Sequence, residues 1–446
     1  MTHVFLIDGR HHTICDLSTA ISPSTKLVIS SEIFEKLIQS RKIVEAFVNS
    51  PEPVYGLNTG LGGNLKHRLS PDEIPNFQRQ ILAGRSVGVG ESASEEISRT
   101  MLLCRIIGMS KAVSGISLST FEMMVNLFNK NCSPVVPMTG SIGAGDLIIG
   151  AHFGGCLIGE GKLWLNGEML PAKNALAEAG LEPVTLQAKD ALALCNHSAF
   201  STALGVIALN ECHRLYTLSK GVSLLSGEGY GINPTIFDDE INRLRPAAGQ
   251  VNAASWFRRG LQGSSLYYPD SKRSIQDAIS FRVIASLYGT AENALRQATR
   301  EIEIELNASS DNPAVLPGAA NMLSTPNFHT PSIALAFDTL AIVTVHLATA
   351  AMQRVVKLMA PQLSGLARYL SPIGGASAGF VPMQKTAAAL LAEIRLQASP
   401  ASLDAMPVSE MVEDIAPQTP LTIKKLSAQL ISFEWLISLE ALVGSQ

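Results

Sequence analysis

The sequence predicts a mainly α-helical protein, and three observations support that fold class. Long stretches place apolar residues three and four positions apart, which is the spacing of one face of an α-helix. Strict alternation of apolar and polar residues, which marks a half-buried strand, is confined to short pieces. Of the 446 residues, 46% are hydrophobic and only 16% are charged, against roughly 25% charged in an average soluble domain. A chain of this length can bury a large core.

Helical periodicity dominates from residue 95 onwards. Between Met101 and Met109, for example, the apolar residues follow the three-and-four spacing. The same pattern predicts helices within six stretches: 95–130, 188–225, 274–306, 333–359, 379–397 and 419–443. Short extended segments are expected at 4–7 and 163–170, where Asn166-Gly167 is a strong hairpin turn.

Three loops stand out from the helical pattern. They are a glycine-dense segment at 55–63, a second glycine-rich loop at 139–146 and a polar loop at 307–313. Enzymes often hold their chemistry in irregular loops set on a rigid scaffold. Because no repeat or linker divides the chain, we expect one continuous structural unit, with a loop-rich active-site portion at 1–190 and a central helix bundle at 191–446.

The composition limits the classes of partner and compartment. The scarcity of charge indicates apolar surface that is hidden against other copies of the chain. A formal charge of −4 without basic clusters argues against nucleic acid as a partner. Six cysteines lie far apart without a CxxC pair, as expected of reduced thiols in a cytoplasmic protein.

The sequence also argues against a membrane location. A membrane-spanning helix needs about 20 predominantly apolar residues. The best candidate, 332–352, is interrupted by Asp338 and His346. Residues 1–10 lack the basic start and long apolar run of a signal peptide. We therefore expect a cytoplasmic protein without a membrane anchor.

Neither glycine-rich loop has the spacing of a phosphate-binding loop. Segment 55–63 has no lysine-serine or lysine-threonine ending, and segment 139–146 follows no strand of a βαβ unit. Singly, each is compatible with a turn-rich connection. Together with other segments they form an ordered set of motifs: YGLNTG at 55–60, GVG at 88–90, PMTGSIGAGDL at 137–147, LIGEG at 157–161, NASSDNP at 307–313, PNFH at 326–329, PAS at 400–402 and ED at 413–414.

This ordered set resembles the histidine and aromatic amino acid ammonia-lyase family, from about residue 50 to residue 440. The resemblance implies a homotetramer built on a long central helix bundle, with active sites formed by loops from more than one subunit. It also implies a small amino-acid-like substrate. The segment FEWL at 433–436 precedes a further helical tail in the family, so a shortened lid is expected here.

One departure from the family concerns its prosthetic group. Members form the electrophile methylidene-imidazolone by cyclising and dehydrating an internal Ala-Ser-Gly that precedes Asp-Leu. Here Gly143-Ala144 is followed directly by Gly145-Asp146, so the serine that supplies the methylidene carbon is missing. Ser141 is a poor substitute, because cyclisation needs an unhindered amide on the next residue, which is isoleucine. We expect a degenerate loop, no methylidene-imidazolone and no other cofactor.

A second departure removes another amine-handling group. The family pattern Gln-Asp-x-Tyr-Ser-x-Arg reads QDAISFR at 276–282, with Ile279 where the tyrosine stands. In the family that tyrosine lies beside the prosthetic group and helps with the amine. Both differences from the family pattern therefore affect the step in which ammonia leaves the substrate.

The rest of an elimination site is retained. The resemblance assigns Tyr55 to abstraction of the β-proton and Arg282 to the substrate carboxylate. It assigns Asn196 and Gln276 to the amides around that carboxylate. Arginine suits a carboxylate because its planar guanidinium makes two charge-assisted hydrogen bonds at once. Glu413 matches a glutamate that faces the substrate ring in histidine-specific members.

Two basic residues are unusual for the family. Arg85 stands where members carry the histidine, phenylalanine or leucine that selects the ring, and Lys385 follows a matched glutamine near the pocket wall. Both indicate a substrate with a polar or anionic tail. No metal is expected, because the candidate histidines lack metal-ligand spacing: they are His152, His197 and His329.

Each assignment has a structural alternative. Tyr55 and Glu413 could stabilise turns, and Asn196 could make a purely structural hydrogen bond. Arg282 could form a surface ion pair, while the two unusual basic residues could point into solvent.

Four functions remain open. The first is a lyase that expels a good leaving group, such as trimethylamine, and so needs no electrophile; the family includes such a branch, ergothionase, which acts on the betaine ergothioneine. The second is an addition enzyme or cyclase acting on an unsaturated acid. The third is an inactive, lyase-like binding protein, and the fourth is a conventional ammonia-lyase.

Overall fold

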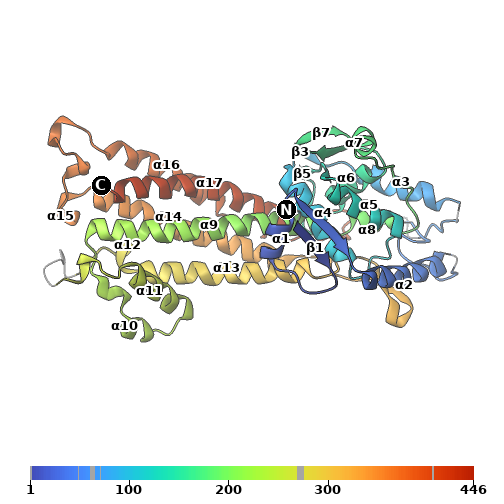
Figure 1. Cartoon of the computed structure of the whole chain (residues 1–446), viewed down its shortest axis with the longest axis horizontal. Helices are drawn as coiled ribbons and strands as arrows, with labels where there is room; N and C mark the ends of the chain where they lie inside the picture. Colours follow the sequence, from blue (N-terminus) through green and yellow to red (C-terminus); the bar gives the residue numbers. More distant parts are fainter. Residues whose placement is uncertain (1–2, 49, 61–65, 71, 269–275, 404–405) are drawn as a thin grey trace. The chain divides into compact units, whose positions relative to one another are not determined.

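The computed structural model describes residues 3–48, 50–60, 66–70, 72–268, 276–403 and 406–446. They form two compact units: unit 1 comprises 1–207, 300–334 and 401–421, and unit 2 comprises 208–299, 335–400 and 422–446. This grouping differs from the expected division at residue 190, because 300–334 and 401–421 pack with the N-terminal part. Helices dominate both units, as predicted (Figure 1).

Unit 1 combines short helices with small sheets. Strands β1 and β2 are parallel, and β3–β5, β4–β6–β7 and β8–β9 pair in antiparallel fashion. The elements of unit 1 are β1(His3–Ile7), α1(Ile14–Ala20), β2(Thr25–Ile29), α2(Ser31–Val48), α3(Ile74–Arg85), β3(Val89–Ser92), α4(Glu95–Met109), α5(Leu118–Asn129), β4(Cys132–Pro134), β5(Pro137–Thr139), α6(Leu147–Leu157), β6(Lys162–Leu165), β7(Glu168–Pro171), α7(Ala172–Glu178), α8(Asp190–Cys195), β8(Ala314–Leu316) and β9(Asn321–Leu323).

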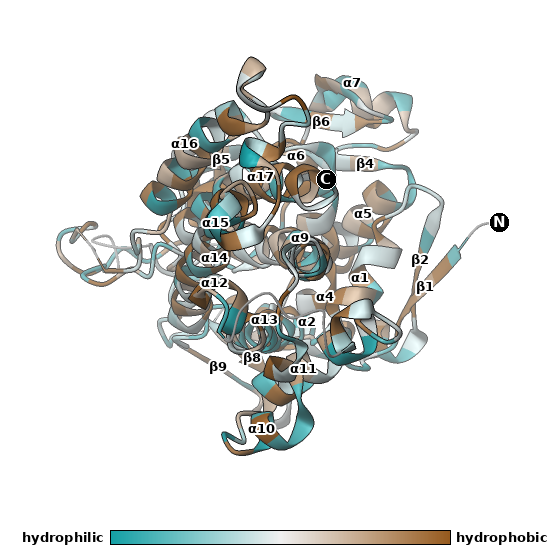
Figure 2. Ribbon diagram, turned by 90° about the vertical axis from the view of Figure 1, so that its left-hand side faces the viewer, coloured by the Kyte–Doolittle hydropathy of each residue, from teal (hydrophilic) through white to brown (hydrophobic). Residues whose placement is uncertain are grey.

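Unit 2 is a bundle of long helices, of which some begin or end in unit 1. Its elements are α9(Ala199–Tyr230), α10(Asp239–Arg243), α11(Ala248–Gly260), α12(Ile279–Arg282), α13(Ile284–Leu306), α14(Pro331–Leu358), α15(Pro361–Ser364), α16(Val381–Gln397) and α17(Thr419–Gly444). Viewed end-on, α9 lies between α13, α14 and α17 (Figure 2).

Side-chain contacts fix α9 in this central position. The Tyr216 hydroxyl hydrogen-bonds Thr344 of α14 at 2.7 Å, and its ring meets that of Phe433 of α17 at 6.3 Å between centroids. One turn further along α9, Ser219 hydrogen-bonds the hydroxyl of Tyr288 of α13 at 2.5 Å. These buried hydroxyls of Tyr216 and Ser219 thus find partners on neighbouring helices.

The structure breaks three of the predicted helical stretches. Stretch 95–130 divides into α4 and α5 around Gly115, whose φ is +69° and whose place could not hold a Cβ, because it would lie 2.5 Å from Val44. Stretch 188–225 divides into α8 and α9 at 196–198, and stretch 274–306 divides at Val283, with 274–275 outside the described residues. Helices α2 and α3 lie outside the stretches for which the sequence predicts helices.

The structure confirms the predicted extended segments and their hairpin turn. The predicted extended segments are β1, β6 and β7, and Asn166 and Gly167 have the positive φ values of 52° and 89° that their hairpin turn requires. Five of the six cysteines are buried and Cys15 is exposed, and all six are free thiols.

Within the part of the chain that the structure describes, three helical segments are long and apolar enough to cross a membrane by length and composition alone. They are Asp190–Tyr230, Pro331–Leu358 and Thr419–Gly444. The sequence prediction considered only the second. The most apolar window of the first is 94% buried within the protein, whereas that of the third is only 44% buried. The third segment, α17, therefore presents apolar surface that the chain itself does not cover.

Candidate active site

Loop 139–146, between β5 and α6 of unit 1, is the meeting point of four segments. The backbone N–H of Asp146 donates to the carbonyl of His197 at 2.6 Å, and that of Gly145 donates to the carbonyl of Phe328 at 2.8 Å. The N–H of Gln418 donates to the carbonyl of Ile142 at 2.8 Å. The loop, the α8–α9 break, the NFH segment and the start of α17 are thus joined.

Asp146 anchors the loop to the start of α9. Its buried carboxylate accepts hydrogen bonds from the hydroxyls of Ser141 (2.6 Å) and Ser201 (2.9 Å), and from the backbone N–H of Ser201 at 2.9 Å. Burial raises the pKa of this carboxyl, and the serine hydrogen bonds oppose that rise. An acidic group at the first turn of a helix also satisfies free N–H groups there.

Asn196 contacts the loop directly. A Cβ at Gly145, where φ is +69°, would lie 2.5 Å from Asn196 Oδ1, so only glycine allows this close approach. The Asn196 side chain is buried, and its Nδ2 donates to the carbonyl of Asn312 at 3.3 Å. The structural hydrogen bond considered for Asn196 is therefore present, and its amide oxygen faces loop 139–146.

Tyr55, Arg85 and Glu413 also belong to unit 1, and each is half-buried. Tyr55 lies in a tight turn in which the N–H of Val54 donates to Asn58 Oδ1 at 2.8 Å. Residues 61–63 of its predicted glycine-rich loop lie outside the described residues. Arg85 ends α3 and donates to the carbonyl of residue 81 in its own helix at 3.3 Å, and Glu413 pairs through its backbone with residue 408.

Gln276, Arg282 and Lys385 belong to unit 2, and all three are exposed. Arg282 Nη1 donates to Gln276 Oε1 at 3.0 Å. Two of the three predicted carboxylate-binding residues, Gln276 and Arg282, thus lie side by side, and the acceptor of this hydrogen bond is a neutral amide. Lys385 stands on α16.

Sequence reasoning missed a buried ion pair that holds the QDAISFR segment. Arg354 of α14 and Glu440 of α17 are joined at 2.5 Å and 3.0 Å, and both are almost fully buried. Arg354 Nη1 also donates to the carbonyl of Ser280 at 3.2 Å. The pairing of residues so distant in sequence left no local signal. Through Ser280, this ion pair fixes the helix that ends with Arg282.

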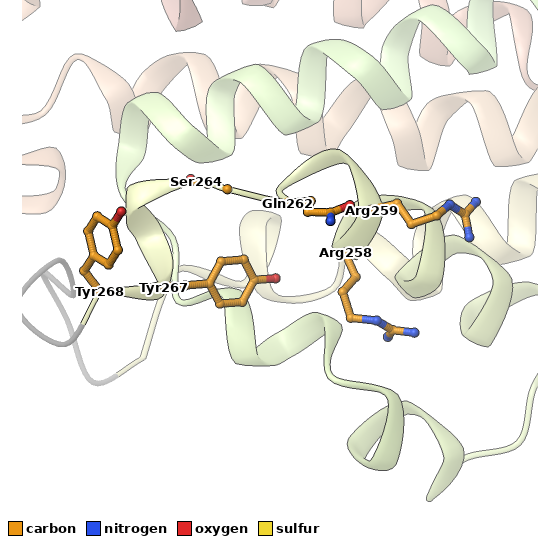
Figure 3. A pocket seen from close by; sticks show the side chains of 7 residues that line it. Arg258, Arg259, Gln262, Ser264, Tyr267 and Tyr268 are labelled. Carbon is orange, nitrogen blue, oxygen red and sulfur yellow. The ribbon is translucent and has the colours of Figure 1, made fainter.

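Two larger hollows lie in unit 2. One, of about 600 Å³, is lined by α12, α13, α14 and α16 and includes Ile279, Lys357 and Arg395. The other, of about 530 Å³ beside α11, is lined by Arg258 and Tyr267 among others, but its side chains diverge (Figure 3). Arg258 already donates to Asp239 at 3.2 Å. Only the first hollow includes a residue of the QDAISFR segment.

Among the described residues, no group of three or more histidine, cysteine, aspartate or glutamate side chains could hold a metal ion. The buried imidazole of His197 has its pKa lowered to about 3 by burial, with Arg105 adding to the effect. His197 therefore stays neutral at physiological pH.

The family model of the aromatic amino acid lyases matches residues 13–446. The chain belongs to the aromatic amino acid lyase family. It is 37% identical to the histidine ammonia-lyase of Halalkalibacterium halodurans over 415 residues, which cover 93% of this chain and 81% of the relative. It is 32% identical to that of Alkaliphilus metalliredigens over 441 residues, covering 99% and 87%.

Solved structures of this family share the fold. Ergothionase from Treponema denticola, solved in complex with desmethyl-ergothioneine sulfonic acid, superimposes with a TM-score of 0.95 at 30% identity, covering 99% of this chain and 89% of that one. Histidine ammonia-lyase from Trypanosoma cruzi gives 0.89 at 30% identity, covering 99% and 84%. The resemblance stated from the motifs is therefore confirmed at the level of family and fold.

Proposed function

We propose that this protein is a carbon–nitrogen lyase that eliminates a good leaving group, for example trimethylamine, from an amino-acid-like betaine without methylidene-imidazolone. The single observation that carries the proposal is the sequence of the loop, in which Ala144 is bonded directly to Gly145. The likeness to an ergothionase supports the same reading.

The residues of the loop do not fit the prosthetic group. No hydroxyl-bearing residue stands between Ala144 and Gly145, so dehydration cannot create a methylidene carbon there. The amide nitrogen that would have to attack a carbonyl, that of Gly145, donates to Phe328 instead. Ser141, the nearest hydroxyl, donates to Asp146 and accepts from the N–H of Gly143 at 3.1 Å. The proposed reaction therefore does not use methylidene-imidazolone.

Elimination needs a base, a carboxylate anchor and a leaving group. The ionised phenol of Tyr55 takes the β-proton, the C–H electrons form the Cα–Cβ double bond, and the Cα–N bond breaks with its electrons on the amine. A quaternary ammonium leaves as a neutral tertiary amine, so no electrophile is needed to activate it. Arg282 holds the substrate carboxylate, assisted by the amides of Gln276 and Asn196.

Arg85 and Lys385 would meet the substrate's side chain. Two cations favour a polar or anionic tail, which is the substrate class expected from the sequence. Glu413 would face a heterocyclic ring and accept a hydrogen bond from its N–H. An anionic carboxylate and an anionic tail would together account for three basic residues in a chain that is poor in charge.

The site also requires assembly into the homotetramer that the resemblance implies. Gln276, Arg282 and Lys385 are exposed in the single chain, whereas a base and a carboxylate anchor work best where water is excluded. We therefore propose that other copies of the chain cover these side chains and complete the pocket.

The proposal is tested with a panel of amino acids and their trimethyl betaines, followed by the absorbance of the conjugated acid and by amine release. We expect product from a histidine-type betaine with wild type. Tyr55→Phe should lower turnover by about 10²- to 10⁴-fold, the usual contribution of a general base, while substrate binding measured by calorimetry persists. Tyr267→Phe, an exposed tyrosine outside the site, is the matched control.

Other results would favour the alternative functions. Product formation only from an unsaturated acid and an amine or internal nucleophile would indicate an addition enzyme. Binding without turnover in either direction would indicate a binding protein, and ammonia release from histidine would indicate a conventional lyase.

A further inference from the structure

A small pocket at the start of α9 is lined by a carboxyl group that the proposed chemistry does not use. The pocket has a volume of about 10 Å³, enough for about one water molecule. Its lining includes Arg105 of α4, His197 and Ser198 of the α8–α9 break, and Glu305 near the end of α13. All belong to unit 1.

Glu305 is linked to the site through Ser198. The Ser198 hydroxyl hydrogen-bonds Glu305 Oε1 and lies 3.1 Å from the hydroxyl of Ser310, which also accepts from the backbone N–H of Ser198 at 3.2 Å. Ser198 is two residues from Asn196, whose amide oxygen contacts the loop. The Glu305–Ser198 contact is thus separated from Asn196 by two backbone units.

Glu305 has no cation to neutralise it in this pocket. Arg105, the nearest candidate, is held by Asp311 at 2.6 Å and 3.3 Å and by the carbonyl of Ala193 at 3.0 Å. The carboxylate of Asp146 in the loop repels a negative charge on Glu305. A protonated Glu305 removes this repulsion and can donate to Ser198, which leaves the serine hydroxyl free for Ser310.

We propose that Glu305 is a positioning residue that acts through Ser198, and that its protonated form holds Asn196 against the loop. This inference deepens the proposed function, on which its catalytic part rests. Burial raises the pKa of Glu305 to about 7, and Asp146 adds to the rise while the hydrogen bond from Ser198 opposes it. Near neutral pH, Glu305 therefore changes between its protonated and ionised forms.

Two other titratable groups that line this pocket, His197 and Cys104, keep their charge states in that range, whereas burial also raises the pKa of Asp146, which is the same in every variant compared below. The pKa of His197 is lowered to about 3 and that of Cys104 is raised to about 12, so both stay neutral. Arg105 and Asp311 remain an ion pair. Beyond them, burial lowers the pKa of Lys189 to about 8. Lys189 is present in every variant below, so comparison between variants removes its contribution.

The first test needs no substrate. Folding shifts the Glu305 pKa upward, so the folded state holds the proton more tightly, and wild-type stability should fall as pH rises from about 4.5 to about 7. Glu305→Gln, which mimics the protonated acid, should lose that part of the slope in the melting temperature. Glu303→Gln, a carboxylate on the same helix, is the matched control and should keep it.

Hydrogen exchange of residues 195–201 at fixed pH tests the positioning itself. At pH 8, Glu305→Gln should exchange more slowly than wild type in this segment, and at pH 5 the two should agree. With a turned-over betaine, the wild-type rate should fall above pH 7 while Glu305→Gln retains activity. Ser198→Ala should lower the rate several-fold and add no further loss when combined with Glu305→Gln.

Identical melting slopes and identical exchange at both pH values in wild type and Glu305→Gln would overturn the inference. Additive effects of Ser198→Ala and Glu305→Gln on the rate would also overturn it. If no betaine is turned over but the exchange contrast is present, the proposed function fails while the role of Glu305 stands.

Discussion

At Arg282, a carboxylate-binding role and a surface ion pair predict different contacts for the guanidinium. Its guanidinium donates to the amide of Gln276 and is otherwise exposed in the single chain. The ion pair considered from the sequence is not what this contact shows, since its acceptor is a neutral oxygen. A planar guanidinium can bind both oxygens of a substrate carboxylate, whereas a lysine ammonium is a point charge.

Replacement of Arg282 by lysine should therefore weaken substrate binding even though the charge is kept. Loss of one charge-assisted hydrogen bond costs roughly 1.5–3 kcal/mol, or about 10- to 100-fold in KM. Arg259→Lys, at an exposed position on α11, should leave KM unchanged. Steady-state kinetics with a betaine substrate checks this, and equal KM values for Arg282→Lys and wild type would remove Arg282 from the site.

At the scale of elements, the bundle depends on a close approach that the sequence pattern does not reveal. Gly249 of α11 and Gly289 of α13 meet backbone to backbone: a Cβ at Gly289 would lie 2.4 Å from the backbone nitrogen of Gln250. Both glycines lie within helical stretches, where glycine is normally a weakness. Their positions make sense only once the two helices are packed together.

Gly289→Ala should consequently destabilise the fold, because a backbone atom cannot move aside as a flexible side chain can. Overpacking of this kind costs about 1–3 kcal/mol. Gly221→Ala in α9 is the matched control: no atom lies within 4 Å of its Cβ position, and alanine should stabilise the helix by about 0.5–1 kcal/mol. Urea unfolding measures both, and a stabilising Gly289→Ala would refute the close contact.

Local patterns predicted some elements well and others poorly. Stretch 333–359 lies within two residues of α14 (Pro331–Leu358), because a strongly periodic apolar face marks a long helix. The break at 196–198 could not be predicted, because the helical pattern of stretch 188–225 continues across it and the break depends on distant contacts. One of these is the bond from the Asp146 N–H to the carbonyl of His197.

The candidate site divides in the same way. The motif resemblance assigns candidate roles to Tyr55 and Arg282, because each lies in a recognisable string of residues. It did not find the Arg354–Glu440 ion pair or Glu305, because their roles arise from neighbours that are remote in sequence.

At the scale of the whole molecule, the scarcity of charge has a counterpart on α17. Ile431 and Trp435 are each 64% exposed, and their spacing of four residues places them on one face of the helix. Leu442 and, on α14, Leu335 are also more than half exposed. Exposed apolar side chains gathered along a helix mark a surface that binds protein or lipid.

We expect this surface to bind other copies of the chain. The protein should sediment as a homotetramer without detergent, and Trp435→Glu should shift it towards smaller species. Leu244→Glu, which changes an exposed leucine next to α10, should leave the assembly intact. Sedimentation equilibrium distinguishes these cases, and a wild-type monomer, or a protein that stays dispersed only in detergent, would contradict the expectation.

Elimination without methylidene-imidazolone can be tested with one purified sample of the protein. Its intact mass is measured, and it is then given histidine and the trimethyl betaine of histidine separately while conjugated product is followed by absorbance. We predict the mass of the unmodified chain, product from the betaine and none from histidine. A protein lighter by two water molecules, one lost on cyclisation and one on dehydration, together with ammonia release from histidine, would show a conventional ammonia-lyase instead.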